Sequence, residues 1–392
     1  MRIVLFAHPN FIGSQSMPRY AKWLHDGLED RGHQVAIWSP VARFFNMPLP
    51  KNLKKWMGYV DQYIVFPIWV KRQLTKSAKD TLFVLTDNAL GPWVSLVSDR
   101  PHVMHCHDFL AQLSAIDMIP ENPTSATGKQ YQAYIRRGYK KAQNFISISE
   151  KTQSDLHFLL KAPPALSKVV YNALTQTFEP TSNKNLIRLQ LQAQTGIELK
   201  SGFILHVGGN QWYKNRGGII EIYNSWREVA KNPLPLLLIG SEPDNSLLSK
   251  KEGSEYSVDI HFITGKSDKF VKQAYQAASL FLFPSLAEGF GWPILEAMAS
   301  GTHVVTTGLP PMTEVAGSAA TFIHKRPFED DKVDRWAKES SRSLESAIVS
   351  HEDQNVIQAG IQNAQRFTSK MSLDQIESIY QTVLLGQTID HV

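Results

Sequence analysis

The chain has very little cysteine, no long apolar run and no apolar leader. Cys106 is the single cysteine among 392 residues. One cysteine excludes a disulfide within the chain and is typical of a reducing compartment. No apolar run approaches the roughly 18 residues that a membrane-spanning helix requires, and residues 1–6 are typical of a first strand, not of a signal peptide. We therefore expect a cytoplasmic protein, either free or peripheral on the inner face of the membrane.

Motifs of metal and dinucleotide sites are also absent from the sequence. No Asp-x-Asp follows an expected strand, and no His, Cys and Asp residues share the spacing of metal ligands. We therefore expect neither a metal nor another cofactor. The first expected strand continues into His8-Pro9-Asn10-Phe11-Ile12-Gly13 and not into Gly-x-Gly-x-x-Gly, which argues against a dehydrogenase-type dinucleotide site.

Composition indicates a globular protein with an uneven distribution of charge. The chain is 43% hydrophobic and 20% charged, as folded domains are, and its length suggests two domains. Residues 1–180 hold 21 Lys and Arg against 13 Asp and Glu, whereas the remainder holds 20 against 23. The excess positive charge thus belongs to the first half.

Basic and aromatic residues concentrate between positions 43 and 72. No nucleic-acid-binding motif accompanies them, so we expect no nucleic-acid partner. An anionic membrane surface, or an anionic lipid-linked acceptor, fits this composition better. A solvated face over an apolar core is the alternative. The residues are Arg43, Phe44, Phe45, Lys51, Lys54, Lys55, Trp56, Tyr59, Tyr63, Phe66, Trp69, Lys71 and Arg72.

Short apolar runs alternate with helical patterns in both halves of the chain, which predicts parallel sheets covered on both faces. We expect strands at 3–7, 35–39, 81–86, 101–105, 144–149, 203–207, 234–239, 259–263, 280–283, 304–307 and 320–323. Helices are expected at 18–32, 217–230 and 269–278, within 333–365 and near 372–385.

The pattern weakens between about 173 and 200, in a polar stretch that we interpret as an interdomain connection. The prediction is an α/β protein with two doubly wound, Rossmann-like domains that face a central cleft. They span 1–180 and 198–366, and a final helix at 372–388 packs back on the first domain. Ligands bind such sheets at the carboxyl ends of the strands.

The most informative segment is 284–301, which follows the apolar strand 280–283. Its sequence predicts a glycine-rich turn and then a short helix that has Pro293 in its first turn and ends at Gly301. Such a junction directs free backbone N–H groups and the positive end of a helix dipole at one place, where phosphate can bind. Glu288 lies before the helix and Glu296 within it. This layout suits a nucleotide-sugar. The alternative is that Glu296 is an ordinary solvated residue of the helix.

The segment 281–301, with its Glu288-x7-Glu296, resembles the signature of retaining glycosyltransferases of the GT-B fold, in particular glycosyltransferase family 4 (group 1). Further segments agree with that family in order and spacing, so the resemblance covers nearly the whole chain. They are Arg31-Gly32-His33-Gln34-Val35, His105-Cys106-His107-Asp108, Ser147-Ile148-Ser149, Val169-Val170-Tyr171-Asn172-Ala173, His206-Val207-Gly208-Gly209, Lys214-Asn215, Gly265 and Glu314-Val315-Ala316-Gly317.

The resemblance implies three catalytic residues, His107, Lys214 and Glu288. Glu288 would contact hydroxyls of the donor sugar, and His107 would face that sugar from the first domain. Lys214 would neutralise the diphosphate as it departs. Glu296 would bind the ribose. A lysine and a helix N-terminus that stabilise the leaving group supply the kind of preorganised charge that is usually the largest catalytic contribution.

The resemblance also implies further contacts with the donor. Backbone amides of Gly289, Phe290 and Gly291 would hold the sugar and diphosphate. The turn Gly13-Ser14 after the first strand would approach the phosphates or the acceptor, and Gly265 would belong to a base-binding loop. The family's usual arginine is replaced by Gly209-Asn210. Arg216 either supplies the second cation, or the site uses one.

The resemblance thus implies transfer of a sugar, with retention, from a UDP- or GDP-sugar to a hydroxyl acceptor in polysaccharide or glycolipid assembly. No metal is expected. Two alternatives stay open. One is a nucleotide-sugar epimerase of the same architecture, which would convert donor without an acceptor. The other is a nucleotide-binding Rossmann protein without transfer activity.

Overall fold

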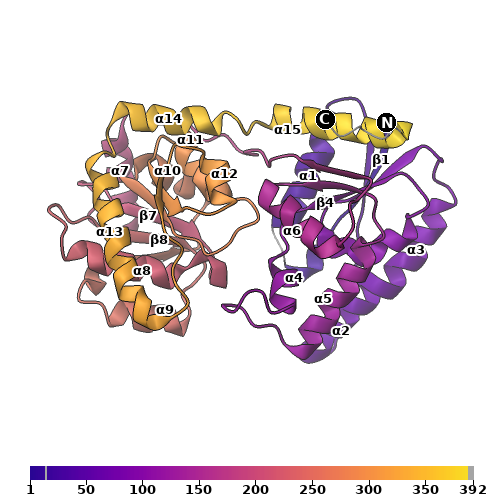
Figure 1. Cartoon of the computed structure of the whole chain (residues 1–392), viewed down its shortest axis with the longest axis horizontal. Coiled ribbons are helices and arrows are strands. Elements are labelled where there is room, and N and C mark those ends of the chain that lie inside the picture. Colours follow the sequence, from indigo (N-terminus) through magenta and orange to yellow (C-terminus); the bar gives the residue numbers. More distant parts are fainter. Residues whose placement is uncertain (14–15, 387–392) are drawn as a thin grey trace. The chain divides into compact units, whose positions relative to one another are not determined.

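The computed structural model describes residues 1–13 and 16–386. They form two compact units, and each is described by itself. The first unit comprises Met1–Ile119, Pro123–Ala173 and the chain from Ser369 onward. The second comprises Pro120–Asn122 and Leu174–Thr368. Each contains one parallel six-stranded sheet with helices packed against it (Figure 1).

The sheet of the first unit has the strand order β2-β1-β3-β4-β5-β6. Its strands are β1 (Arg2–Phe6), β2 (Gln34–Trp38), β3 (Thr81–Leu85), β4 (His102–Cys106), β5 (Asn144–Ser147) and β6 (Leu166–Val169). Alternate residues of β1 enter different cores, because successive side chains of a strand point to opposite faces. Ile3 and Leu5 join one apolar cluster, and Val4 and Phe6 join the other. The sheet is therefore covered on both faces, as predicted.

The helices of the first unit include a π-helical turn between two α-helices. In chain order they are η1 (Asn10–Ile12), α1 (Ser16–Glu29), α2 (Lys51–Val60), the π-helix η2 (Asp61–Val65), α3 (Phe66–Leu74), η3 (Asn88–Leu96), α4 (Leu110–Ala115), α5 (Ala126–Tyr139), α6 (Glu150–Leu160) and α15 (Ser369–Leu385).

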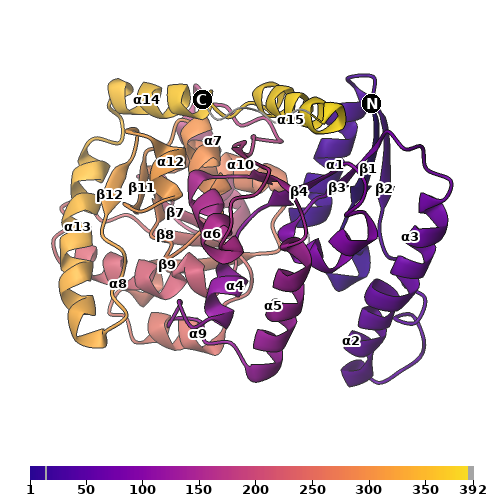
Figure 2. The same ribbon diagram turned by 45° about the vertical axis from the view of Figure 1, so that its right-hand side comes forward.

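Helix α15 lies beside α1 although it comes last in the sequence (Figure 2). Its Leu373 and Ile376 join the apolar cluster that contains Ile3 and Leu5. Arg31 at the end of α1 forms ion pairs with Asp374 at 2.7 Å and Glu377 at 2.8 Å. Apolar burial and these pairs together attach the last helix to the first unit.

The sheet of the second unit has the order β12-β11-β10-β7-β8-β9. Its strands are β7 (Ile204–Gly208), β8 (Leu236–Gly240), β9 (Ile260–Thr264), β10 (Leu280–Phe283), β11 (Val304–Thr307) and β12 (Thr321–Ile323). Its helices are α7 (Lys184–Thr195), η4 (Trp212–Lys214), α8 (Arg216–Arg227), α9 (Asn245–Glu252), η5 (Ser257–Asp259), α10 (Asp268–Ala277), α11 (Trp292–Ala299), α12 (Met312–Ala316), η6 (Asp330–Lys332), α13 (Val333–Val349) and α14 (Gln354–Ala364).

The predicted doubly wound α/β architecture is confirmed, and each predicted strand is present to within about two residues. One interpretation needs correction, because the polar stretch between 173 and 200 contains helix α7. Its apolar pattern is weak since Leu191 is the main buried apolar side chain and Leu186 and Leu189 are exposed. Buried Arg188 takes a core position and donates to the carbonyl of Ala277 at 3.0 Å.

Candidate donor site

The predicted strand–turn–helix of the signature segment is confirmed at the carboxyl end of β10. The strand ends at Phe283, a loop follows, and α11 begins at Trp292 with Pro293 in its first turn. Gly291 caps the helix with φ 115°, in the left-handed region that side chains disfavour. A Cβ there would also lie 3.3 Å from the side chain of Ile294. The glycine is thus required by the tight entry into α11.

Two loops that are distant in sequence meet at this edge of the sheet. The loop after β7 carries η4, and the loop after β10 carries Glu288. The backbone N–H of Leu286 donates to the carbonyl of Tyr213 at 2.8 Å. The side chain of Asn215 donates to the carbonyl of Pro284 at 2.9 Å. These bonds fix one loop against the other and so position the side chains that they carry.

Lys214 and Glu288 form the polar centre of the site. Lys214 Nζ lies 2.8 Å from Glu288 Oε1, and Ser285 Oγ donates to the same oxygen at 2.8 Å. The side chains of lysine and glutamate are 13% and 8% exposed. Lys214 Nζ also lies 4.9 Å from the ring centroid of Phe283. The cation is thereby held at a fixed, largely dry position, where its charge acts strongly on a ligand.

Glu296, the second signature carboxylate, lies on α11 and accepts a hydrogen bond from the Tyr275 hydroxyl at 2.8 Å. Burial raises the pKa of Glu296, although the Tyr275 hydrogen bond and the Lys214 charge act in the opposite direction. Tyr275 thus holds one carboxylate oxygen, Oε2, and keeps the group more acidic than burial alone would allow. The second oxygen, Oε1, takes no part in this hydrogen bond.

Replacing Tyr275 by phenylalanine tests this arrangement through pH dependence. Loss of the hydroxyl removes an influence that lowers the pKa of Glu296, so the carboxylate takes up its proton at a higher pH. We expect the acidic limb of UDP or GDP binding, measured by calorimetry between about pH 5 and pH 8, to move to higher pH. Near neutrality, binding weakens by about 1 kcal/mol. Tyr223→Phe, which removes a buried hydroxyl bonded to Leu234, is the matched control; equal profiles for both variants would contradict the assignment.

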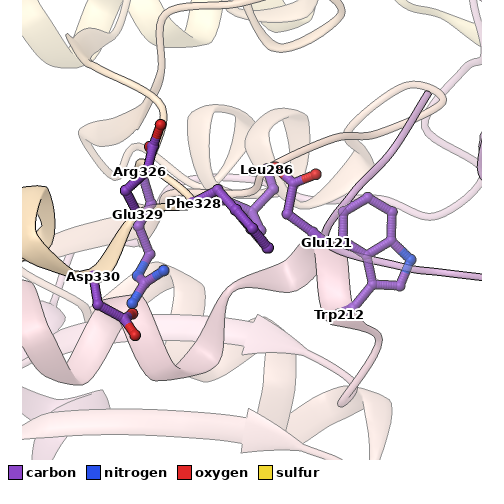
Figure 3. A pocket seen from close by; sticks show the side chains of 7 residues that line it. All are labelled: Glu121, Trp212, Leu286, Arg326, Phe328, Glu329 and Asp330. Carbon is purple, nitrogen blue, oxygen red and sulfur yellow. The ribbon is translucent and has the colours of Figure 1, made fainter. Parts of the chain in front are cut away.

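A cavity of about 570 Å³ lies beside the loops that carry Lys214 and Glu288. Trp212 comes from the same short helix as Lys214, and Leu286 from the same loop as Glu288. Trp212 and Glu121 lie toward one end in Figure 3, and Arg326, Glu329 and Asp330 toward the other. One end of the cavity thus combines an aromatic ring with a carboxylate, and the other holds three charged side chains. Its lining is Glu121, Trp212, Leu286, Arg326, Phe328, Glu329 and Asp330.

Arg216 is the first residue of α8 and follows the loop after β7. Its side chain is buried and donates to the carbonyl of Ser241 at 2.9 Å and to the side chain of Asn210. It stacks over Phe262, 5.1 Å from the ring centroid. Burial lowers its pKa. The guanidinium therefore ties the loops after β7 and β8 together, which positions Asn210 where the family usually has its arginine.

The remaining predicted contacts of the second unit lie at strand ends or in the signature loop. Gly265 follows β9 with φ 65°, and no atom lies within 4 Å of the position that a Cβ would take. Phe290 is buried, with its ring 6.1 Å from that of Trp292. Gly289 lies between Glu288 and Phe290 in the loop before α11.

Three predicted residues belong to the first unit. His107 follows β4 and is buried; its Nε2–H donates to the carbonyl of Thr86 at 2.9 Å. Burial lowers the pKa of His107, against the opposing charge of Asp87, so the ring is neutral at physiological pH. Gly13 ends η1 with φ 76°, and Ser14 lies outside the described residues.

The first unit also contains a histidine–carboxylate pair that sequence reasoning missed. His8 follows β1 and Asp87 follows β3, its neighbour in the sheet; Nε2 lies 2.8 Å from Oδ2. Burial, the largest single influence, favours the neutral acid. The hydrogen bond and charge of His8, the charge of His107 and the backbone N–H of Ala89 together outweigh it and hold the pKa of Asp87 below its usual value. Both residues follow predicted strands, which was the available signal, but the strand order that joins them was not known.

Comparison with known proteins assigns the fold and the family. The solved structure of Anabaena Alr3699/HepE in complex with UDP superposes with a TM-score of 0.69 at 18% identity, covering 97% of this chain and 100% of that one. Together with the two parallel sheets, this likeness defines a GT-B glycosyltransferase fold. Residues 17–175 match the family model Glycosyltransferase Family 4, and residues 188–353 match Glycosyl transferases group 1. The chain belongs to the group 1, family 4-like glycosyltransferases.

Curated relatives are distant. O-antigen chain mannosyltransferase B of Escherichia coli is 27% identical over 180 residues, which are 45% of this chain and 46% of that protein. An uncharacterized glycosyltransferase of Methanocaldococcus jannaschii is 22% identical over 350 residues, 83% of this chain and 84% of that one. The chain thus spans about half the length of the first of these relatives.

Proposed function

We propose that the protein transfers a sugar from a nucleoside-diphosphate sugar, with UDP or GDP as the nucleotide, to a hydroxyl acceptor with retention of configuration. The observation that carries this proposal is the contact between Lys214 and Glu288 at the entrance of α11, with Glu296 on the same helix. The site then combines one cation and two carboxylates with the N-terminus of α11, which matches the charge of a diphosphate flanked by two hydroxyl-rich rings.

The chemistry follows from the charge that develops when the bond between sugar and phosphate breaks. Negative charge grows on the departing diphosphate, where Lys214 and the N-terminus of α11 stabilise it. Positive charge grows on the sugar, beside the Glu288 carboxylate. Glu296 holds the ribose through its second oxygen. In this proposal, fixed protein groups take the place of a divalent ion, so transfer requires no metal.

The acceptor hydroxyl attacks the anomeric carbon while the phosphate departs from the same face, and the departing phosphate oxygen takes the hydroxyl proton. The relatives described above support the substrate class. One is an O-antigen mannosyltransferase, and HepE was solved with UDP. We infer a role in polysaccharide or glycolipid assembly.

Product analysis with UDP-glucose and GDP-mannose tests the activity. We expect nucleoside diphosphate to appear with one of these donors, and to appear faster when a hydroxyl acceptor is added. A nucleotide-sugar epimerase would instead isomerise the donor without any acceptor and release no nucleoside diphosphate. Either that isomerisation, or no conversion of any UDP- or GDP-sugar, would contradict the proposal.

We also propose that the region 43–72 contacts an anionic membrane surface from the cytoplasmic side. Ile64 in η2 and Ile68 in α3 are 56% and 50% exposed, and Lys71 and Arg72 lie in the last turn of α3. Apolar side chains beside basic ones suit adsorption to anionic lipid. Within the described residues, no helix is both long and apolar enough to cross a bilayer.

Liposome co-sedimentation tests the membrane contact. We expect binding to vesicles that contain phosphatidylglycerol, weaker binding to pure phosphatidylcholine, and about a thirtyfold loss in an Ile64→Ser/Ile68→Ser variant, from about 1 kcal/mol per side chain. Val258→Ser, which changes a side chain that is 79% exposed in the second unit, should bind like the parent. Binding that does not depend on anionic lipid would refute the contact.

A further inference from the structure

The first unit contains an aromatic pocket that the donor site does not use. It has a volume of about 620 Å³ and lies between α2, η2 and α5. Five aromatic side chains line it, three from α2 and η2 and two from α5. They are Trp56, Tyr59, Tyr63, Tyr131 and Tyr134.

The inner rings of the aromatic pocket hold one another in place. The hydroxyls of Tyr63 and Tyr131 are hydrogen-bonded at 2.7 Å, and Tyr59 stacks on Tyr131 with the ring centroids 5.6 Å apart. Burial raises the pKa of both Tyr63 and Tyr131, so these phenols stay neutral and keep their hydroxyl hydrogens. The result is a rigid wall that offers ring surface together with hydroxyl groups.

The outer rings are open to solvent. Trp56 is 62% exposed and Tyr134 is 45% exposed, which is unusual for such large side chains unless they contact a ligand or partner. Polar side chains accompany them, namely Lys55 and Gln130, with Ser125 at the start of α5. The pocket therefore combines exposed ring faces with hydrogen-bonding groups around them.

Tyr63 belongs to the π-helical turn η2. Such turns are rare and occur frequently at functional sites. Here the turn is stabilised from inside, because the buried Asp61 carboxylate accepts the backbone N–H groups of Arg43, Phe44 and Phe45 at 2.9–3.1 Å. The π-helical turn η2 is thus a second indication of a functional site beside the pocket, independent of the exposed rings.

We propose that the aromatic pocket binds a pyranose ring of a saccharide acceptor. A pyranose presents apolar C–H groups on its faces and hydroxyls around its edge. Ring faces and hydrogen-bonding groups in one pocket match both parts. A hydrocarbon chain would match the rings alone and would form no hydrogen bond with the polar groups around them. The role of the pocket as an acceptor site rests on the proposed function, whereas the binding of a saccharide there does not.

Fluorescence titration of the whole protein with mannotriose and maltotriose tests the binding, because Trp56 reports on the pocket. We expect a saturable change in tryptophan emission with at least one saccharide, and loss of that change in Trp56→Phe. Tyr134→Ala should weaken the affinity at least about fivefold, because it removes one of the exposed ring faces that would contact the saccharide. Tyr134→Phe keeps the ring and should bind within about twofold of the parent.

Dodecylphosphocholine serves as a hydrocarbon chain without a sugar. Saturable binding of this detergent at the pocket without saccharide binding would overturn the proposal, and so would the absence of any Trp56-dependent signal with either saccharide. The role as acceptor site is read separately, in transfer assays with the same saccharide as acceptor. Tyr134→Ala should raise the acceptor KM at least about fivefold and leave donor hydrolysis in water unchanged. If saccharide binds but no donor is ever converted, the proposed function fails and the binding site stands.

Discussion

Replacing Lys214 with alanine is expected to reduce donor turnover by about 10²–10³-fold, which is the usual effect of losing one preorganised group that stabilises developing charge. Lys214 Nζ is fixed 2.8 Å from Glu288 and lies over the Phe283 ring, so water cannot reproduce its position. The substitution also leaves the carboxylate, whose side chain is 8% exposed, without its cation. The measurement is the rate of nucleoside diphosphate release at saturating donor.

The control for this variant is Lys338→Ala. Lys338 forms an exposed i,i+4 pair with Asp334 on α13, and such pairs contribute little. We expect parent-like turnover there, and melting curves that show both variants folded at the assay temperature, which excludes unfolding as the cause. A Lys214→Ala enzyme that releases product as fast as the parent would remove Lys214 from the mechanism.

The second large effect is expected for Glu288→Gln, and it separates binding of the sugar from binding of the nucleotide. In the proposed site Glu288 contacts the sugar, whereas UDP or GDP alone has none. We expect transfer to fall at least about 100-fold, as for loss of a charged transition-state contact, while affinity for the bare nucleoside diphosphate changes by less than about threefold. Calorimetry with the nucleoside diphosphate and turnover with the nucleotide-sugar measure the two quantities.

Glu296→Gln should show the converse pattern, because Glu296 is assigned to the ribose that every donor and product shares. Its nucleoside diphosphate affinity should fall about tenfold or more, from loss of a charge-assisted hydrogen bond. Glu339→Gln, at an exposed pair with Arg335, is the neutral control. Identical behaviour of the two signature glutamates would mean that they do not bind opposite ends of one ligand.

Local sequence predicted the centre of this site well. The apolar strand, the glycine turn, Pro293 and the following helix are contiguous, so each imposes its geometry on the next residues. The resemblance to family 4 added Lys214, which lies 74 positions from Glu288 in the sequence and 2.8 Å from it in space. That contact depends on bonds between two loops, which no local pattern contains.

What sequence reasoning missed depends on tertiary packing. Tyr275 looks like an ordinary core residue of α10 until α11 places Glu296 beside its hydroxyl. His8 and Asp87 meet because β1 and β3 are neighbours in the sheet although β2 lies between them in the sequence. Arg188 fills a core position of α7 through hydrogen bonds, so the apolar period that would have revealed the helix is weak.

Thermal stability in the presence of nucleotide-sugars tests the central claim, that the second unit holds such a donor through Lys214, Glu288 and Glu296. A ligand that binds the folded state raises the melting temperature in proportion to the logarithm of its concentration above Kd. We predict a concentration-dependent rise with at least one UDP- or GDP-sugar, and a much smaller rise in a Lys214→Ala/Glu296→Ala variant. No rise with any such donor, or an equal rise in both proteins, would contradict the account.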